Sequence, residues 1–140
     1  MGTVTIGSAR NYLRLSPATF LGTPPKDRLR FLQADLVLDE VKASHVVDLL
    51  FEFDGLVPFF DDLAEHCRDW DYDHRSTWGT KSDLQLEARR GPSPADEPAY
   101  PFLSVTLRNR GWHEQGWTIT TALLVPPDQL PAIPRAIEAL

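Results

Sequence analysis

The sequence predicts a single α+β domain in which an antiparallel β-sheet of about six to seven strands carries one amphipathic helix on one face, followed by a short C-terminal helix. Two observations support this fold class. Short segments with alternating apolar residues recur between turn residues, as in antiparallel strands, and one segment instead repeats its apolar residues at helical spacing. The 140 residues are 42% hydrophobic and 24% charged, which suits one globular core spanning residues 1–140.

Four strands are expected before the helix, at residues 3–6, 12–15, 28–38 and 41–53. The third contains a slip in the apolar phase, which indicates a bulge or bend. The fourth is the clearest, because its odd positions form one almost wholly apolar face that includes His45. The alternation therefore favours a sheet with one face turned toward a core.

The helix is predicted over about residues 55–70, where the apolar period changes from that of a strand to that of a helix. One side of this helix collects the residues Leu56, Phe59, Phe60, Leu63, Cys67 and Trp70. Asp54 is expected to cap its N-terminus, and Pro58 falls in the first turns, where a missing N–H is best tolerated. Acidic residues occupy the opposite side.

Three more strands are expected after the helix, at residues 83–89, 102–108 and 117–125. Residues 91–101 contain four prolines and are predicted to form a flexible hairpin loop. Asp128 is expected to cap the short C-terminal helix, which Pro131 and Pro134 make irregular until Pro134.

A succession of segments also resembles a known family: VTIGS at residues 4–8, ADLVLDEVKAS at 34–44, LVPFFDDLAEHCRDW at 56–70, LQLEA at 84–88 and WTITTALLV at 117–125. Together they are similar to a small actinobacterial family that is catalogued only as a domain of unknown function. The pattern F-F-x-x-L-A-x-x-x-R-x-W, followed by a second Trp, best marks this resemblance. The chain departs from the family pattern in its proline-rich insert and in the Asp-Tyr-Asp after Trp70. More distantly, the order of sheet and helix is similar to immunity proteins of bacterial toxin systems. The resemblance implies the fold order and no catalytic residue.

The negative charge of the chain is concentrated in residues 52–73. This window holds eight acidic residues and one basic residue, whereas the whole chain has 20 and 14, so the remainder is nearly neutral. Concentrated acidic charge beside aromatic rings is what a surface for a basic protein requires. The predicted binding surface consists of Asp61, Asp62, Glu65, Asp69, Trp70, Asp71, Tyr72, Asp73 and Trp78.

Composition argues against several other partners. A pI near 5.1 with scattered basic residues argues against nucleic acid and against an anionic membrane surface. No apolar run has the length of a membrane span, and the first residues lack the pattern of a secretory signal. The lone Cys67 has no partner for an internal disulfide, so a reducing, cytoplasmic location is expected.

No pattern of catalytic or metal-binding residues stands out. Asp69, Asp71 and Asp73 alternate as at the start of a calcium loop, but His74 and Thr80 stand where that loop needs Gly and Glu. We interpret the segment as a solvated acidic turn. Cys67 lies on the apolar side of the helix and is expected to be a buried small hydrophobe rather than a zinc ligand.

Motifs for a nucleophile elbow, a phosphate-binding loop and a dinucleotide-binding turn are missing from the sequence. Asp61 and Asp62 point toward water, where nothing would raise their pKa for acid–base work. The sequence therefore predicts a protein that is not an enzyme and that needs no metal or cofactor.

Two hypotheses of function follow. The first is a non-catalytic binding module for a basic protein, and its concrete form is an immunity-type inhibitor whose carboxylates mimic phosphates at the active site of a nuclease toxin. The alternative is a small-molecule or metal-binding domain with a site between sheet and helix, lined by His45 and aromatic residues. A third hypothesis is a homodimer, in which exposed strand edges of two copies of the chain pair with each other.

Overall fold

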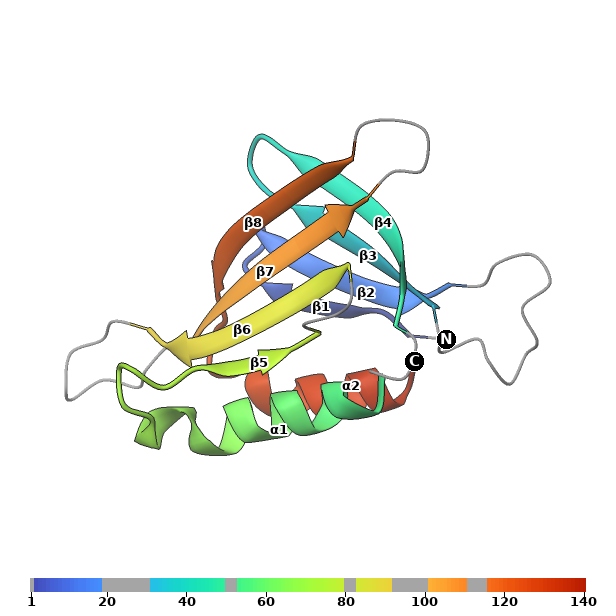
Figure 1. The fold of residues 1–140 in the computed structure, drawn as a ribbon. Coiled ribbons are helices and arrows are strands. Elements are labelled where there is room, and N and C mark those ends of the chain that lie inside the picture. Colours follow the sequence, from blue (N-terminus) through green and yellow to red (C-terminus); the bar gives the residue numbers. More distant parts are fainter. Residues whose placement is uncertain (1, 19–30, 50–52, 80–82, 92–100, 111–115) are drawn as a thin grey trace.

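The computed structural model contains two four-stranded antiparallel sheets and two short α-helices (Figure 1). It describes residues 2–18, 31–49, 53–79, 83–91, 101–110 and 116–140. The N-terminal sheet comprises β1 (Val4–Gly7), β2 (Tyr12–Pro17), β3 (Phe31–Val37) and β4 (Lys42–Asp48). The C-terminal sheet comprises β5 (Ser76–Trp78), β6 (Leu84–Arg90), β7 (Pro101–Asn109) and β8 (Trp117–Leu124). In each sheet every strand pairs with the next one along the chain.

The expected α+β class with antiparallel strands is confirmed, but the expectation of one sheet of six to seven strands is wrong. The missing element is β5, a three-residue strand in a segment that the sequence shows only as a turn after the helix. Ser76 pairs with Ala88 of β6, so β5 begins a second sheet instead of extending the first. Apolar alternation identifies strands, whereas strand pairing depends on contacts between residues that are distant in sequence.

The first helical region consists of a 3₁₀ turn at Phe53–Gly55, α1 at Leu56–His66 and a second 3₁₀ turn at Cys67–Asp69. The predicted helix is therefore present but tightens over its last turn. Asp54 is not its N-cap, because the 3₁₀ turn moves that position to Gly55 and no side chain caps the helix there. The predicted apolar side is buried, at Leu56, Phe59, Phe60 and Leu63.

The second helical region is a 3₁₀ turn at Leu130–Ala132, followed by α2 at Ile133–Glu138. Asp128 is not its N-cap, since Ala132 occupies that position. A proline lies in the first turn of each segment, where the missing N–H costs no helical hydrogen bond. The helix becomes regular at Ile133, one residue before the expected position.

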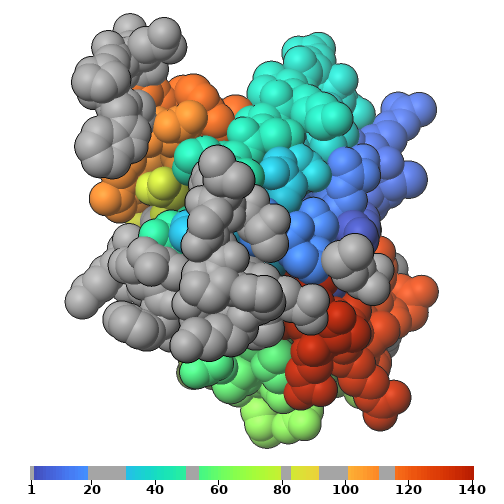
Figure 2. All heavy atoms as spheres, turned by 90° about the vertical axis from the view of Figure 1, so that its right-hand side faces the viewer, coloured from blue at the N-terminus to red at the C-terminus, as the bar shows by residue number. Residues whose placement is uncertain are grey.

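The inner faces of both sheets and the buried sides of both helices form one hydrophobic core. The helices lie side by side across one end of the two sheets (Figure 1), and the same arrangement is visible from the side, with α1 in green and α2 in red (Figure 2). Helix α1 contacts α2 and β5, and α2 also contacts β1. The helices therefore cover the gap between the edge strands β1 and β5.

A side chain strengthens the contact between α2 and the N-terminal sheet. Gln129, just before the second helical region, accepts a hydrogen bond from the N–H of Gly7 at 3.1 Å and donates one to the Gly7 carbonyl at 2.7 Å. At the opposite side of the molecule, β4 contacts β7. The two sheets are thus tied together at both sides of the core.

One predicted strand begins later in the structure than expected. The fourth predicted strand, residues 41–53, begins at Lys42, because Val41 is part of the preceding turn and its carbonyl accepts a hydrogen bond from Leu38 N–H at 2.8 Å. Its residues 50–52, and residues 92–100 of the predicted proline-rich loop, lie outside the described residues.

Among the described helices, none has the length and apolar character to span a membrane.

Candidate functional site

The outer side of α1 presents acidic residues to solvent. Since Leu56, Phe59, Phe60 and Leu63 turn toward the core, positions 61, 65 and 69 fall on the opposite side. Asp61, Glu65 and Asp69 are exposed there, and Asp62 is half-buried. Asp61 and Glu65 lie on one side of α1 because steps of four residues follow one side of a helix, and Asp69 follows in the 3₁₀ turn.

The acidic series continues into the turn that leads to β5. Asp71, Tyr72 and Asp73 are all exposed, and 59% of the surface of Tyr72 is open to solvent. The turn is shaped by a hydrogen bond from His74 N–H to the Asp71 carbonyl at 3.1 Å and by one from Arg75 Nη1 to the Tyr72 carbonyl at 2.8 Å. These bonds use backbone carbonyls and leave the carboxylates of the turn toward water.

The charges of this series are mostly uncompensated. Glu65 lies 3.7 Å from His66 Nε2, with both side chains exposed. Within the described part of the chain, no salt bridge involves the carboxylates of Asp61, Asp62, Asp69, Asp71 and Asp73. Their negative charge is therefore available to a partner.

The two tryptophans of the predicted surface are buried instead. Trp70 and Trp78 are each 7% exposed. The Trp70 ring lies against His74, with 4.4 Å between ring centroids, and Trp78 is the inward-facing last residue of β5. Neither ring is open to a partner in this structure, so Tyr72 is the exposed aromatic residue of the predicted set. Three residues of β5 are too few for their alternation to be seen in the sequence.

His45 links the two sheets. Its Nε2 lies 3.0 Å from Oδ2 of Asp83, and Oδ1 of Asp83 lies 3.1 Å from Nε of Arg110. The His45 ring also makes an edge contact with Trp117, at 6.2 Å between centroids and 74° between planes. His45 is half-buried, and these contacts account for its position on the core side of β4. No group of three or more His, Cys, Asp or Glu side chains in the described residues could hold a metal ion.

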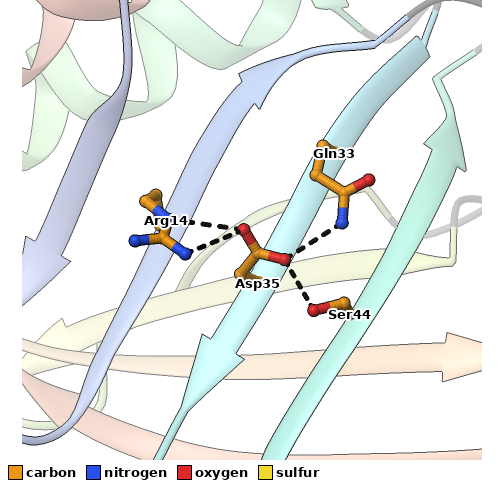
Figure 3. Close-up of polar contacts among 4 residues, drawn as sticks. All are labelled: Arg14, Gln33, Asp35 and Ser44. Carbon is orange, nitrogen blue, oxygen red and sulfur yellow. Dashed lines mark hydrogen bonds and ion pairs between the residues drawn. The ribbon is translucent and has the colours of Figure 1, made fainter.

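A buried carboxylate that the sequence analysis did not single out lies at the centre of the N-terminal sheet (Figure 3). Asp35 of β3 is 9% exposed. Its Oδ1 accepts hydrogen bonds from Ser44 Oγ at 2.6 Å and Gln33 Nε2 at 3.0 Å, and its Oδ2 lies 3.3 Å from both Nε and Nη2 of Arg14. The cluster joins β2, β3 and β4 through their side chains. The sequence signal for this cluster is an acidic residue inside the otherwise apolar stretch ADLVL at residues 34–38, because a carboxylate buried in a strand needs hydrogen-bond partners.

The protonation of Asp35 reflects two opposing effects. Burial by itself would raise the pKa of this carboxyl group. Hydrogen bonds from Ser44, Gln33 and Arg14, together with the Arg14 charge, outweigh burial and lower the pKa below its ordinary value. Asp35 is therefore ionised at neutral pH and serves to hold three strands together.

Cys67 behaves as the sequence predicts. It is buried, 3% exposed, and packs in the core at the end of α1. Burial raises the pKa of its thiol, and the nearby Arg90 charge only partly opposes this effect. A protonated, inaccessible thiol is a poor nucleophile and a poor metal ligand.

In the part of the chain that the structure describes, the cavities that open on the C-terminal sheet include the following two. One, of ≈ 390 Å³, lies over its outer face and is lined mainly by hydroxyl and amide side chains, among them Thr106 and Thr120, whose hydroxyls are 3.0 Å apart. The other, of ≈ 310 Å³, is lined by Tyr72, Arg89, Arg90 and Phe102. The second cavity shares Tyr72 with the acidic turn.

Comparisons with family models and with curated proteins returned no match to this chain. The resemblance to an actinobacterial family and to immunity proteins stays a prediction from the sequence.

Proposed function

We propose that this chain is a non-catalytic binding module that engages a basic protein through Asp61, Asp62, Glu65, Asp69, Asp71 and Asp73, here called the acidic strip. The observation that carries the proposal is that five of these residues are exposed and Asp62 is half-buried, while in the described residues only Glu65 has a salt-bridge partner, the exposed His66. A basic partner would supply the missing counter-charges.

The acidic strip is unfavourable for the fold itself. Asp61 and Glu65 are one helical turn apart, and a pair of like charges at this spacing costs about 0.2–0.5 kcal/mol. Asp69 lies just beyond the C-terminus of α1, where the helix dipole disfavours negative charge. Residues that slightly oppose folding and lie in solvent are candidates for recognition.

Tyr72 supplies an apolar contact beside the charges. An exposed tyrosine carries a large rigid ring and a hydroxyl, and such residues are enriched among those that dominate binding energy. Trp70 and Trp78 are both buried, so neither ring is part of the proposed surface; Trp70 packs against His74 of the turn. The proposed surface is therefore the acidic strip with Tyr72 in its final turn.

The concrete form of the proposal is an immunity-type inhibitor that acts in the cytoplasm. A row of carboxylates resembles the phosphates of a nucleic acid, so it suits the basic active site of a nuclease. Charge complementarity of this kind accelerates association and makes binding sensitive to salt. The lone buried thiol is compatible with a reducing compartment.

The test is affinity capture from the native lysate at low and high salt, followed by a binding titration with the purified captured protein. The wild type is compared with a variant in which Asp61, Asp62, Glu65 and Asp69 become Asn or Gln. A matched control neutralises four exposed acids elsewhere: Asp39, Glu40, Asp128 and Glu138.

We expect a basic protein to bind the wild type and the control with salt-sensitive affinity, and to bind the strip variant at least about tenfold more weakly. Equal binding by the strip variant would contradict the proposal. Equal weakening by the control would show that net charge, rather than this surface, determines binding.

A further inference from the structure

Two arginines at the end of β6 line one small cavity. Arg89 and Arg90 end the strand, and with Tyr72 and Phe102 they line an open cavity of ≈ 310 Å³. Neighbouring side chains of a strand ordinarily point to opposite faces. Here both reach one cavity, whose volume falls at the small end of the range for ligand sites.

Each guanidinium group lies over an aromatic ring. Arg89 Cζ is 5.3 Å from the Phe102 ring centroid, and Arg90 Cζ is 5.2 Å from that of Tyr72. Cation–π contacts hold both guanidinium groups in place. The rings supply no hydrogen-bond acceptor for the N–H groups of the arginines. The cavity therefore combines two positive charges with two apolar ring surfaces.

Among the residues that the structure describes, no carboxylate pairs with these two cations. Arg14, Arg75 and Arg110 each form a salt bridge with a carboxylate. Within the described residues Arg89 and Arg90 form none, and the one hydrogen bond of Arg90 goes from Nη1 to the Trp70 carbonyl at 3.4 Å. The Nε atoms of both are buried without any hydrogen-bond partner.

This arrangement costs the free protein stability. A buried donor without an acceptor destabilises the folded state, and two nearby like charges repel each other. An anion in the cavity would relieve the repulsion and accept hydrogen bonds from the guanidinium groups. A carboxylate fits this arrangement, because its two oxygens match the fork of an arginine.

We propose that this cavity binds a small organic monoanion, a carboxylate attached to a flat aromatic ring. The carboxylate accepts hydrogen bonds from Arg89 and Arg90, and the ring packs against Tyr72 and Phe102. A single negative charge is preferred, because Asp71 and Asp73 flank Tyr72 and the chain carries a net charge of −6.

The test is a titration of the full chain with sodium benzoate at constant ionic strength, followed by backbone amide chemical shifts. We expect saturable shifts at Tyr72, Arg89, Arg90 and Phe102, with a dissociation constant of about 1 mM or tighter. Arg89→Gln and Arg90→Gln should each weaken binding about tenfold. Arg135→Gln, which changes an exposed arginine on α2, should leave binding unchanged.

Two further ligands test the chemistry. Benzamide has the same shape without the charge and should bind at least about tenfold more weakly than benzoate. Phenyl phosphate should also bind more weakly, because of its second charge. Absence of shifts, equal binding of benzamide, tighter binding of phenyl phosphate or unchanged binding by both Arg→Gln variants would each overturn the proposal.

If a Gln variant fails to fold, Arg89→Lys and Arg90→Lys keep the charge but lose the fork, and they should weaken benzoate binding while the spectrum stays that of the wild type. The variant with a neutralised acidic strip should still bind benzoate. The anion site and the protein-binding proposal therefore fail or succeed separately.

Discussion

The N-terminal half, β1–β4 with α1, and the C-terminal half, β5–β8 with α2, share one order of elements: four antiparallel strands in sequence and then a helix. The helices are exchanged between the halves, since α1 packs on β5 and α2 packs on β1. Their outer sides differ. The exposed charged residues are Asp61 and Glu65 in α1, and Arg135 and Glu138 in α2.

The difference between the outer sides of α1 and α2 shows which features of a helix this fold requires. Both helices bury an apolar side in the same core and cover the edge strand of the other half. Helix α2 does so with one basic and one acidic exposed residue, Arg135 and Glu138. A helix that packs in this way therefore does not require acidic residues on its outer side. An acidic outer side is found on α1 and not on α2, and the acidic strip continues it into the turn after α1, which supports a role in recognition.

The largest expected effects come from the buried sides of the two helices. Phe60→Ala in α1 should lower the free energy of unfolding by about 3–5 kcal/mol, and Ile137→Ala in α2 by about 2–5 kcal/mol, because each leaves a cavity in the core. Both residues are fully buried. Urea unfolding, followed at amide groups of both sheets, should keep one common midpoint in each variant. Separate midpoints for the two sheets would show that the halves are independent units.

The next effect distinguishes the two sheets. Asp35→Asn should lower the free energy of unfolding by about 1–3 kcal/mol at neutral pH, because it removes a charged acceptor from Arg14, Gln33 and Ser44. The folded pKa of Asp35 lies below the unfolded value of about 3.9. Its contribution is therefore present above about pH 4 and is lost as the pH falls through the folded pKa.

Urea titrations between pH 7 and about pH 2 should thus bring wild type and Asp35→Asn together at the acidic end. The control in the other sheet is Thr106→Val, which removes a hydroxyl bonded to Thr120. It should cost about 0.5–1.5 kcal/mol at every pH. A constant Asp35→Asn difference over the whole range would contradict the role assigned to its charge.

A third effect concerns the contact between the halves. Gln129→Ala removes both hydrogen bonds to the backbone of Gly7 and should cost about 1–2 kcal/mol. Gln129→Glu keeps an acceptor but loses the donor, so its cost should differ from that of Ala. Hydrogen exchange at Gly7 N–H should accelerate in the Ala variant. Unchanged exchange would mean that this amide is protected by other contacts.

The smallest effect tests the comparison of the helices directly. Asp61→Asn with Glu65→Gln should raise the free energy of unfolding slightly, by up to about 0.5 kcal/mol, because it removes like-charge repulsion on α1. Glu138→Gln on α2 should bring no gain. A clear loss of stability on neutralising α1 would show that its acidic residues are structural.

Much of the fold follows from local patterns. Alternating apolar residues locate seven of the strands, and the helical period locates α1 and its buried side. The division into two sheets does not follow, because β5 has three residues and its pairing with β6 is a non-local contact. The capping residues Asp54 and Asp128 were also wrongly placed, since a 3₁₀ turn precedes each α-helix.

The candidate sites were predictable to different degrees. Helical spacing places Asp61, Glu65 and Asp69 away from the core, as the structure has them. Trp78 could not be placed, because its burial depends on β5. The cavity lined by Arg89 and Arg90 could not be predicted from the sequence either. Strand alternation places neighbouring side chains on opposite faces, and both arginines line one cavity only because β6 ends at Arg90.

The exchange of helices between the halves has a consequence for synthesis on the ribosome. When β1–β4 and α1 have emerged, α1 still lacks β5, and the edge strand β1 still lacks α2. An uncovered strand edge invites pairing with other nascent chains. The N-terminal half therefore reaches its full set of packing contacts only after β5 and α2 have been made.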